Sequence, residues 1–402
     1  MIKKIDVSDL RLGMYIHDLN RDWIEHPFLR NRFRVQSERD IEHIVELGVR
    51  DVYIDTELGL DVSTSLPLSK TDQKLSTEDL HELARTLKRT APQISVHEEI
   101  QQAKHIVKEA NVIVHEILQD CRLGKQVELE KVDPIVSSIT DSIFRNPDAI
   151  VSLLRIKQAD KYTFQHSVAV GTLLISFCRA LSLDREEIEV AGIGGLLHDI
   201  GKMKVPRFIL NKPDKLSERE FAIMKTHVTE GRMILENTPG ISPISVNIAA
   251  EHHEHYDGSG YPLGLKGDEI SRFGQMAAIV DFYDALTSQR IYHASVEPTA
   301  VLKQLLESAD RHFAKPLVHS FIRTVGIYPI GTLVKLENDD LAVVVEQHHE
   351  DLLHPKVRSI FNCRLRSFIR PKNYDLSKPG CQQHIVHFEI PSRWRIEPTA
   401  YL

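Results

Sequence analysis

The sequence is short of cysteine, of long apolar runs and of excess charge of one sign, and each shortage excludes a class of protein. Its four cysteines are scattered over 402 residues without Cys-x-x-Cys spacing, which argues against a disulfide scaffold or a cysteine zinc site. No run approaches the ~20 apolar residues of a membrane span, and Met1–Asp6 does not begin a secretion signal. A net charge of −7 gives no hint of general nucleic-acid binding. We therefore expect a cytoplasmic protein that binds neither membrane nor nucleic acid.

The composition allows real hydrophobic cores, because 42% of the residues are hydrophobic, and the length predicts two or three domains. The patterns predict a mainly α fold, with a small α+β N-terminal domain and a β-rich C-terminal extension. Leu333–Leu336 and Leu341–Val345 predict a hairpin around the turn at Asn338 and Asp339. The expected parts are residues 1–62 (α+β), 63–132 (linker and long helices), 133–325 (helical) and 326–402 (β-rich).

Apolar residues between Val96 and Arg122 recur with the alternating spacing of four and three residues that forms a heptad seam. The seam has two interpretations. It packs the helix on its own domain, or it joins two copies of the chain in a homodimer through Ile100–Cys121. Gly124 is expected to cap the helix in either case.

The stretch Gly194–Pro206 places polar groups at the end of an apolar run. His198 and Asp199 follow residues that predict a buried helix. Burying an imidazole and a carboxylate without partners is costly, and a metal ion is a good partner for both. Lys202 lies three residues after Asp199, so on a helix its ammonium would share the same face. The pair alone would be weak evidence, since most such pairs are surface or hydrogen-bonded residues.

Further candidate ligands follow along the helical region, each on or at the end of an expected helix. Five histidines and two carboxylates exceed the four ligands of a structural zinc and suit two adjacent metals with a bridging carboxylate, for which Asp199 is the natural choice. Two metals would hold and acidify a bridging water and stabilise both oxygens of an in-line displacement, the chemistry of phosphoester hydrolysis. The alternative is a set of ordinary core and capping histidines. The candidates are His166, His198, Asp199, His227, His252, His253 and Asp281.

These residues carry a resemblance to a known family. His198-Asp199, His227, Asp281 and the stretch His252–Pro262 together resemble an HD-GYP domain, a subgroup of the HD metallohydrolases. The likeness continues through Leu265–Ile270 and Asp281–Arg290 and covers about residues 145–325. The N-terminal unit, with Leu12–Tyr15 and His26–Phe28, is similar to a small uncharacterised domain found before HD-GYP domains in bacteria.

The resemblance implies that a metal-bridging hydroxide cuts the bacterial messenger cyclic di-GMP to linear pGpG, with some members continuing to GMP, and so affects motility and biofilm. It makes the seven candidates ligands of two divalent metals, iron or manganese. It also implies that Lys202 contacts a substrate phosphate and assists the leaving oxygen, which develops negative charge. The Gly-Tyr-Pro loop would contact partner proteins, here diguanylate cyclases of the GGDEF type. The other implied substrate contacts are Gly260, Tyr261, Pro262, Asp284 and Arg290.

Two positions depart from the family pattern. Tyr162 stands where some members have a glutamate that helps to hold a third metal, and a neutral phenol is a poor substitute, so we expect two metals. His293 stands where members often have lysine or arginine, so phosphate binding is expected to be weaker or pH-sensitive. Neither departure removes a ligand of the two-metal core.

Two other functions stay open at this point. A binding module would hold cyclic di-GMP or a diguanylate cyclase partner with negligible hydrolysis, and metal content and turnover would discriminate it from the enzyme. An HD-type nucleotidase would act on another phosphate compound. Not every histidine belongs to the site: His255 is expected to be a loop residue, and surface or loop positions are expected for His348, His349, His384 and His387.

Overall fold

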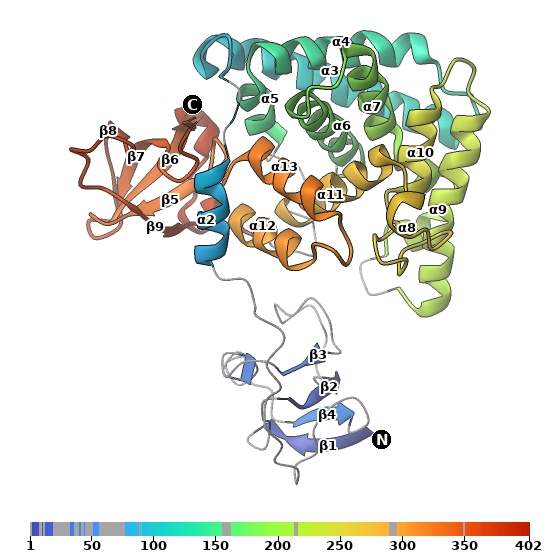
Figure 1. Ribbon diagram of the computed structural model, residues 1–402, viewed down its shortest axis with the longest axis horizontal. Helices are drawn as coiled ribbons and strands as arrows, with labels where there is room; N and C mark the ends of the chain where they lie inside the picture. The colour runs from blue at the N-terminus through green and yellow to red at the C-terminus, as the bar shows by residue number, and fades with distance from the viewer. Residues whose placement is uncertain are drawn as a thin grey trace. The chain divides into compact units, whose positions relative to one another are not determined.

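The chain divides into two compact units, Met1–Gln73 and Lys74–Leu402 (Figure 1). The computed structural model describes, of the first unit, residues 2–7, 10, 13–18, 33–35, 40–41, 44 and 51–55. Of the second it describes residues 77–87, 89, 91–154, 162–212, 216–288, 296–348 and 350–402. The finer division into four parts remains a prediction.

The first unit contains a four-stranded sheet with the order β1-β4-β2-β3, formed by β1 (Ile2–Asp6), β2 (Tyr15–Asp18), β3 (Phe33–Arg34) and β4 (Asp51–Asp55). All its strand pairs are antiparallel. Val52 and Ile54 alternate on β4 and both point into a small core with Ile16 and Ile44. The first unit therefore has a small hydrophobic core of its own.

The second unit begins with a helical region in which α6 is the central element. From Val168 to Cys178 every residue of α6 is buried, because α3, α5, α7, α11 and α13 surround it. The helices are α2 (Thr77–Thr86), α3 (Val96–Arg122), α4 (Leu129–Arg145), α5 (Pro147–Leu154), α6 (Tyr162–Ala180), α7 (Arg185–Leu197), η4 (Ile200–Met203), α8 (Arg207–Leu210), α9 (Glu218–Glu236), α10 (Pro243–Glu251), η5 (Gly267–Glu269), α11 (Arg272–Thr287), α12 (Pro298–Glu307) and α13 (Lys315–Val325).

The heptad seam of α3 lies inside this same unit. Ile100, Ala110 and Ile117 are buried in the core that α4, α6 and α7 share. Packing within one chain therefore accounts for the seam without a second copy. Gly124 follows the helix with a positive φ of 83° and donates its N–H to the carbonyl of Cys121, as expected of a cap.

Two close approaches of backbone set the positions of the elements that carry the candidate ligands. A Cβ on Gly195 would lie 2.7 Å from the Cα of Gly171, so glycine lets α7 pack directly on α6. A Cβ on Gly201 would lie 1.9 Å from the carbonyl oxygen of His227, so glycine also lets η4 rest on α9. These contacts bring the end of α7 and the start of η4 between His166 and His227.

The C-terminal region forms an antiparallel five-stranded sheet with the order β8-β7-β6-β5-β9. The predicted hairpin is confirmed as β5 and β6, with Leu333 opposite Val343. The mainly α fold class with strands at both ends is confirmed as well. The elements are β5 (Leu333–Leu336), β6 (Asp340–Glu346), β7 (Lys356–Asn362), β8 (Ser367–Asp375), β9 (Ile385–Phe388), α14 (Pro391–Trp394) and η6 (Pro398–Tyr401).

The structure also bears on the expectations about cysteine and membrane. All four cysteines are free thiols. Among the residues that the structure describes, no helix has both the length and the apolar character needed to cross a bilayer.

Candidate metal centre

Imidazole and carboxylate groups converge where the ends of several helices meet. His166 comes from the first turns of α6, and His198 and Asp199 follow α7. His227 comes from α9, His252 and His253 follow the end of α10, and Asp281 comes from α11. Of these seven side chains, all except His253 and Asp281 are almost fully buried.

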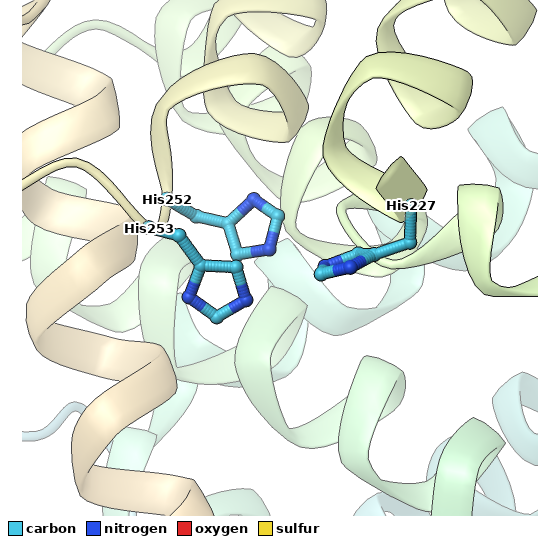
Figure 2. Close-up of side chains that lie close together, drawn as sticks. All are labelled: His227, His252 and His253. Atoms are coloured by element: carbon cyan, nitrogen blue, oxygen red, sulfur yellow. The ribbon is translucent and has the colours of Figure 1, made fainter. Parts of the chain in front are cut away.

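The candidate ligands form two clusters. In the first, ligand atoms of His166, His198 and Asp199 lie within 4.8 Å of one another. In the second, the three imidazoles of His227, His252 and His253 meet the same limit, and Figure 2 shows them turned toward a common point. Each cluster offers three nitrogen or oxygen donors, as a metal site requires.

Two carboxylates each face both clusters. Asp199 Oδ2 lies 3.3 Å from His198 Nε2, whereas its Oδ1 lies 3.4 Å from His227 Nε2. Asp281 repeats the arrangement, with Oδ1 2.9 Å from His166 Nε2 and Oδ2 4.0 Å from His253 Nδ1. Sequence reasoning predicted a bridging position for Asp199. It did not predict one for Asp281, whose position between the clusters depends on how α11 packs on α6.

Whether metal ions fit this site can be tested by asking which of its buried polar atoms lack a hydrogen-bond partner. Among the described residues, the Nε2 atoms of His198, His227 and His252 and Oδ1 of Asp199 are buried without a hydrogen-bond partner. Unpaired buried polar atoms are rare because they are costly. Four of them aimed at one place match the donor set of divalent metal ions.

The other ring nitrogen of each of these histidines is already used. Nδ1 of His198 donates to the carbonyl of Gly195 (2.8 Å), and Nδ1 of His227 donates to that of Met224 (2.7 Å). His252 does the same one turn back on its own helix, to Ala249 at 3.0 Å. With the proton on Nδ1, each Nε2 keeps its lone pair for a metal.

His166 is held by a carboxylate instead of a carbonyl. Its Nδ1 lies 2.7 Å from Oδ2 of Asp284, which is itself buried on α11. A carboxylate in this position fixes the orientation of a ligand histidine and increases its basicity. The structure thus places Asp284 behind His166, while the implied contact of Asp284 with substrate remains a prediction.

For four of the candidate ligands, the electrostatics favour the charge states that metal ligands need. Burial lowers the pKa of His253 to about 3 and that of His252 well below its usual value, so both imidazoles are neutral. For Asp199, burial alone would raise the pKa, but Lys202 and His198 outweigh it and hold the pKa well below the usual range. The same balance, with His166 as the main partner, keeps Asp281 ionised.

Lys202 supplies the cation at the edge of the centre. Its Nζ lies 2.5 Å from Oδ2 of Asp199, and about a quarter of its side chain is exposed. The sequence interpretation placed both groups on one helical face. In the structure α7 ends before His198, and Lys202 reaches Asp199 from η4.

A buried glutamate fixes the loop that borders the centre. Glu254 accepts hydrogen bonds from the backbone N–H groups of Leu263 (2.7 Å), Gly264 (3.2 Å) and Leu265 (3.1 Å). This anchor holds the loop in which Tyr261 stacks on the His253 ring, with 4.8 Å between centroids. Sequence reasoning missed Glu254; the available signal was an acidic residue between the histidine pair and the glycine-rich loop.

Gly260 is required by the same loop. A Cβ at this position would lie 2.3 Å from the backbone nitrogen of His255 and 2.5 Å from the Cα of Glu254. Pro262 follows Tyr261 in the loop. His255 stacks on His312, with 4.2 Å between ring centroids, and is not among the residues of either cluster.

Several predicted positions lie outside what the structure describes. Arg290, His293 and His349 are outside the described residues, and for Tyr162, at the start of α6, the side chain is not described. In the C-terminal region, His384 and His387 are exposed and His348 is partly buried.

The helical fold and the His/Asp donor set define an HD-domain metallohydrolase. Residues 149–317 match the HD domain family model, and residues 2–132 match a domain of unknown function, DUF3391. The chain is 37% identical over 401 residues to a cyclic di-GMP phosphodiesterase of Pseudomonas aeruginosa, covering 98% of this chain and 94% of that protein. It therefore belongs to the family of HD-GYP-type cyclic di-GMP phosphodiesterases.

Two further likenesses are more limited. The chain is 39% identical over 142 residues to the 3′3′-cGAMP-specific phosphodiesterase 1 of Vibrio cholerae. The aligned region covers 35% of this chain and 33% of that protein. A solved HDG"Y"P protein from Bdellovibrio bacteriovorus aligns with 80% of this chain and 98% of its own, with a TM-score of 0.47 and 18% identity.

Proposed function

We propose that this chain hydrolyses cyclic di-GMP to linear pGpG in a metal-dependent reaction that lowers the concentration of the messenger. One observation carries the proposal: two ligand clusters face a shared carboxylate, Asp199, and present buried nitrogen atoms without partners. The likeness to the Pseudomonas aeruginosa enzyme along almost the whole chain supports the substrate.

The donor set suits two divalent metal ions, iron or manganese, because both accept mixed imidazole and carboxylate ligands. His166 and His198, with one oxygen of each carboxylate, would hold the first. The second would be held by the three histidines His227, His252 and His253 with the remaining carboxylate oxygens. When bound, two such ions supply a water-derived nucleophile at neutral pH and neutralise charge on the phosphate.

The residues beside the clusters supply binding and orientation. The ammonium of Lys202 is partly exposed at the edge of the centre, which supports a role in binding a substrate phosphate and stabilising the leaving oxygen. Burial raises the pKa of Tyr261, so its phenol stays a hydrogen-bond donor beside His253. Gly260 and Pro262 shape this loop. We also assign Arg290 to phosphate binding, since guanidinium donors match phosphate oxygens.

The exposed edge of the Gly-Tyr-Pro loop suits a partner protein. Leu263, directly after the motif, is 66% exposed although it is a large apolar residue. We propose that a diguanylate cyclase of the GGDEF type contacts this edge. A homodimer through α3 has no comparable support, because the α3 seam is already buried within one chain.

The test measures turnover of cyclic di-GMP and of 3′3′-cGAMP by the full chain purified without oxygen. The metal content of the same protein is analysed. We expect pGpG from the wild type and a loss of at least about 100-fold in Asp199→Ala, which also loses metal. The matched control is Asp375→Ala, which removes a carboxylate paired with a histidine in the C-terminal sheet and should leave turnover unchanged. A folded, metal-loaded wild type that binds cyclic di-GMP without cutting it would contradict the proposal and favour a receptor. Preference for 3′3′-cGAMP would contradict the assigned substrate alone.

A further inference from the structure

Three arginines line a pocket at the C-terminal end of α6, outside the metal centre. The cavity measures about 360 Å³. Arg179 lies thirteen residues after His166 on the same helix, so about 20 Å of helix separates the pocket from the nearest ligand. The lining includes Arg89, Ser176, Arg179 and Arg323.

Only one of these arginines has a carboxylate partner among the described residues. Arg89 forms a paired contact with Asp148, at 2.6 and 3.2 Å. Arg179 and Arg323 each donate to a backbone carbonyl, of Ile143 and Ala180, and form no ion pair in the part of the chain that the structure describes. Three positive charges against one negative charge leave the pocket with a net charge of +2.

This excess of positive charge is unfavourable without a ligand. Burial and the charge of Arg89 lower the pKa of Arg179, which means that its charged form is destabilised there. Arg179 lies in the last turn of α6 and Arg323 in the last turn of α13, and the carbonyls to which they donate lie near the ends of α4 and α6. The partial negative charge of these helix ends offsets part of the two positive charges but supplies no full anion. Each guanidinium has five N–H donors, and the contacts of Arg179 and Arg323 use few of them.

We propose that this pocket binds a phosphate group in its doubly charged form, as a phosphate monoester or as free phosphate. A monoester carries close to two negative charges above pH ~6, which matches the excess charge of the pocket. Guanidinium groups bind phosphate oxygens through paired donors, and the hydroxyl of Ser176 adds a polar group to the lining.

Size and charge together restrict the ligand. Pockets for small molecules start at roughly 300 Å³, so this cavity has room for phosphate with one nucleoside and not for a dinucleotide. A phosphodiester such as the cyclic substrate carries a single charge on each phosphate. The site therefore discriminates monoesters, such as nucleoside monophosphates, from cyclic dinucleotides.

The pocket also lies where three parts of the second unit meet. Arg89 precedes α3, Asp148 belongs to α5, and the Arg89 guanidinium donates to the side chain of Gln347 after β6 (2.9 Å). Gln347 in turn donates to the carbonyl of Val325 at the end of α13 (3.1 Å). An anion bound here would therefore stabilise the junction between the helical region and the C-terminal sheet and raise Tm.

The experiment is calorimetric titration of the full chain with inorganic phosphate and with GMP at pH 7.5. It uses the metal-loaded wild type and the Asp199→Ala variant, in which binding at the metal centre is impaired. We expect Asp199→Ala to bind phosphate at one site. Adding Arg179→Gln or Arg323→Gln to this variant should raise the Kd at least about tenfold. The control is Arg185→Gln, an exposed arginine of α7 paired with Asp141 and Glu189, which should leave the Kd unchanged.

The two arms identify the source of the phosphate. Tighter binding of GMP supports a monoester ligand, and equal binding of both supports recognition of the phosphate alone. Thermal unfolding of each variant checks that it folds, and having two arginine variants protects against the loss of either. No binding in Asp199→Ala, or an unchanged Kd in both folded arginine variants, would overturn the proposal. Turnover of cyclic di-GMP without added phosphate should be unchanged in both arginine variants, which separates this site from the catalytic one.

Discussion

Histidines paired with acidic groups occur both in the metal centre and in the C-terminal sheet, but the two regions differ in what remains unpaired. In the sheet, Nε2 of His348 lies 2.9 Å from Asp375, and Nε2 of His387 lies 3.0 Å from Glu389. In the centre, His198 and His252 are buried, their Nδ1 atoms are bonded within their own helices, and their Nε2 atoms have no partner. For His198 and His252, a buried nitrogen without a hydrogen-bond partner therefore marks the candidate ligand better than a nearby carboxylate does.

The largest contrast should appear when one histidine from each region is removed. His252→Ala deletes a ligand atom, so we expect the bound metal to fall and kcat/KM to drop by more than the 10–100-fold typical for loss of an outer partner. His348→Ala removes a partly exposed pair worth at most about 1 kcal/mol and should change neither the bound metal nor kcat/KM. Metal analysis and turnover of both variants measure the difference. Equal effects of the two substitutions would contradict the distinction between the histidines of the two regions.

A smaller contrast concerns the carboxylates that orient histidines. Asp284→Ala removes the partner of His166 Nδ1 and should weaken metal affinity about 10–100-fold, with a parallel fall in kcat. Glu389→Gln alters the partner of His387 and should leave metal affinity unchanged. If Asp284 instead contacts substrate, KM rises while metal affinity stays at the wild-type value. Metal titration alongside steady-state kinetics distinguishes the two roles.

A third contrast separates the loop anchor from the centre that it borders. Glu254→Gln leaves up to three backbone N–H groups without a charged acceptor, so Tyr261 should lose its fixed position. We expect about a tenfold fall in kcat/KM with the metal content unchanged. The control is Glu269→Gln, which alters an exposed glutamate that accepts one N–H in a neighbouring turn. A loss of metal in Glu254→Gln would show that the anchor acts on the ligands themselves.

The comparison also explains which features the sequence could predict. Residue types and helical periodicity predicted the candidate ligands, because a histidine or aspartate at the end of an apolar helix needs a buried partner. The α3 seam stayed ambiguous because packing within a chain and between chains produces the same heptad spacing. Strand β8 was missed because most of its residues are exposed and it contains Pro371, so apolar residues do not alternate along it. The position of Asp281 between both clusters depends on packing of distant helices, which spacing along the chain does not encode.

The smallest expected effect belongs to the C-terminal sheet and disappears in acid. Burial would raise the pKa of Asp375, but hydrogen bonds from Ser377 and His348 outweigh it and lower the pKa to about 2. Because the folded-state pKa is below the unfolded value of 3.8, this pair stabilises the fold above pH ~4, and the contribution disappears as the pH falls through about 2. Asp375→Asn should therefore lower the free energy of unfolding by no more than about 1 kcal/mol at pH 7 and by much less at pH 2. Urea unfolding at both pH values measures this. A loss of metal or turnover in this variant would mean that the sheet and the metal centre are coupled. In that case the hydrogen-bond partners of a histidine would not be enough to tell a metal ligand from a structural residue.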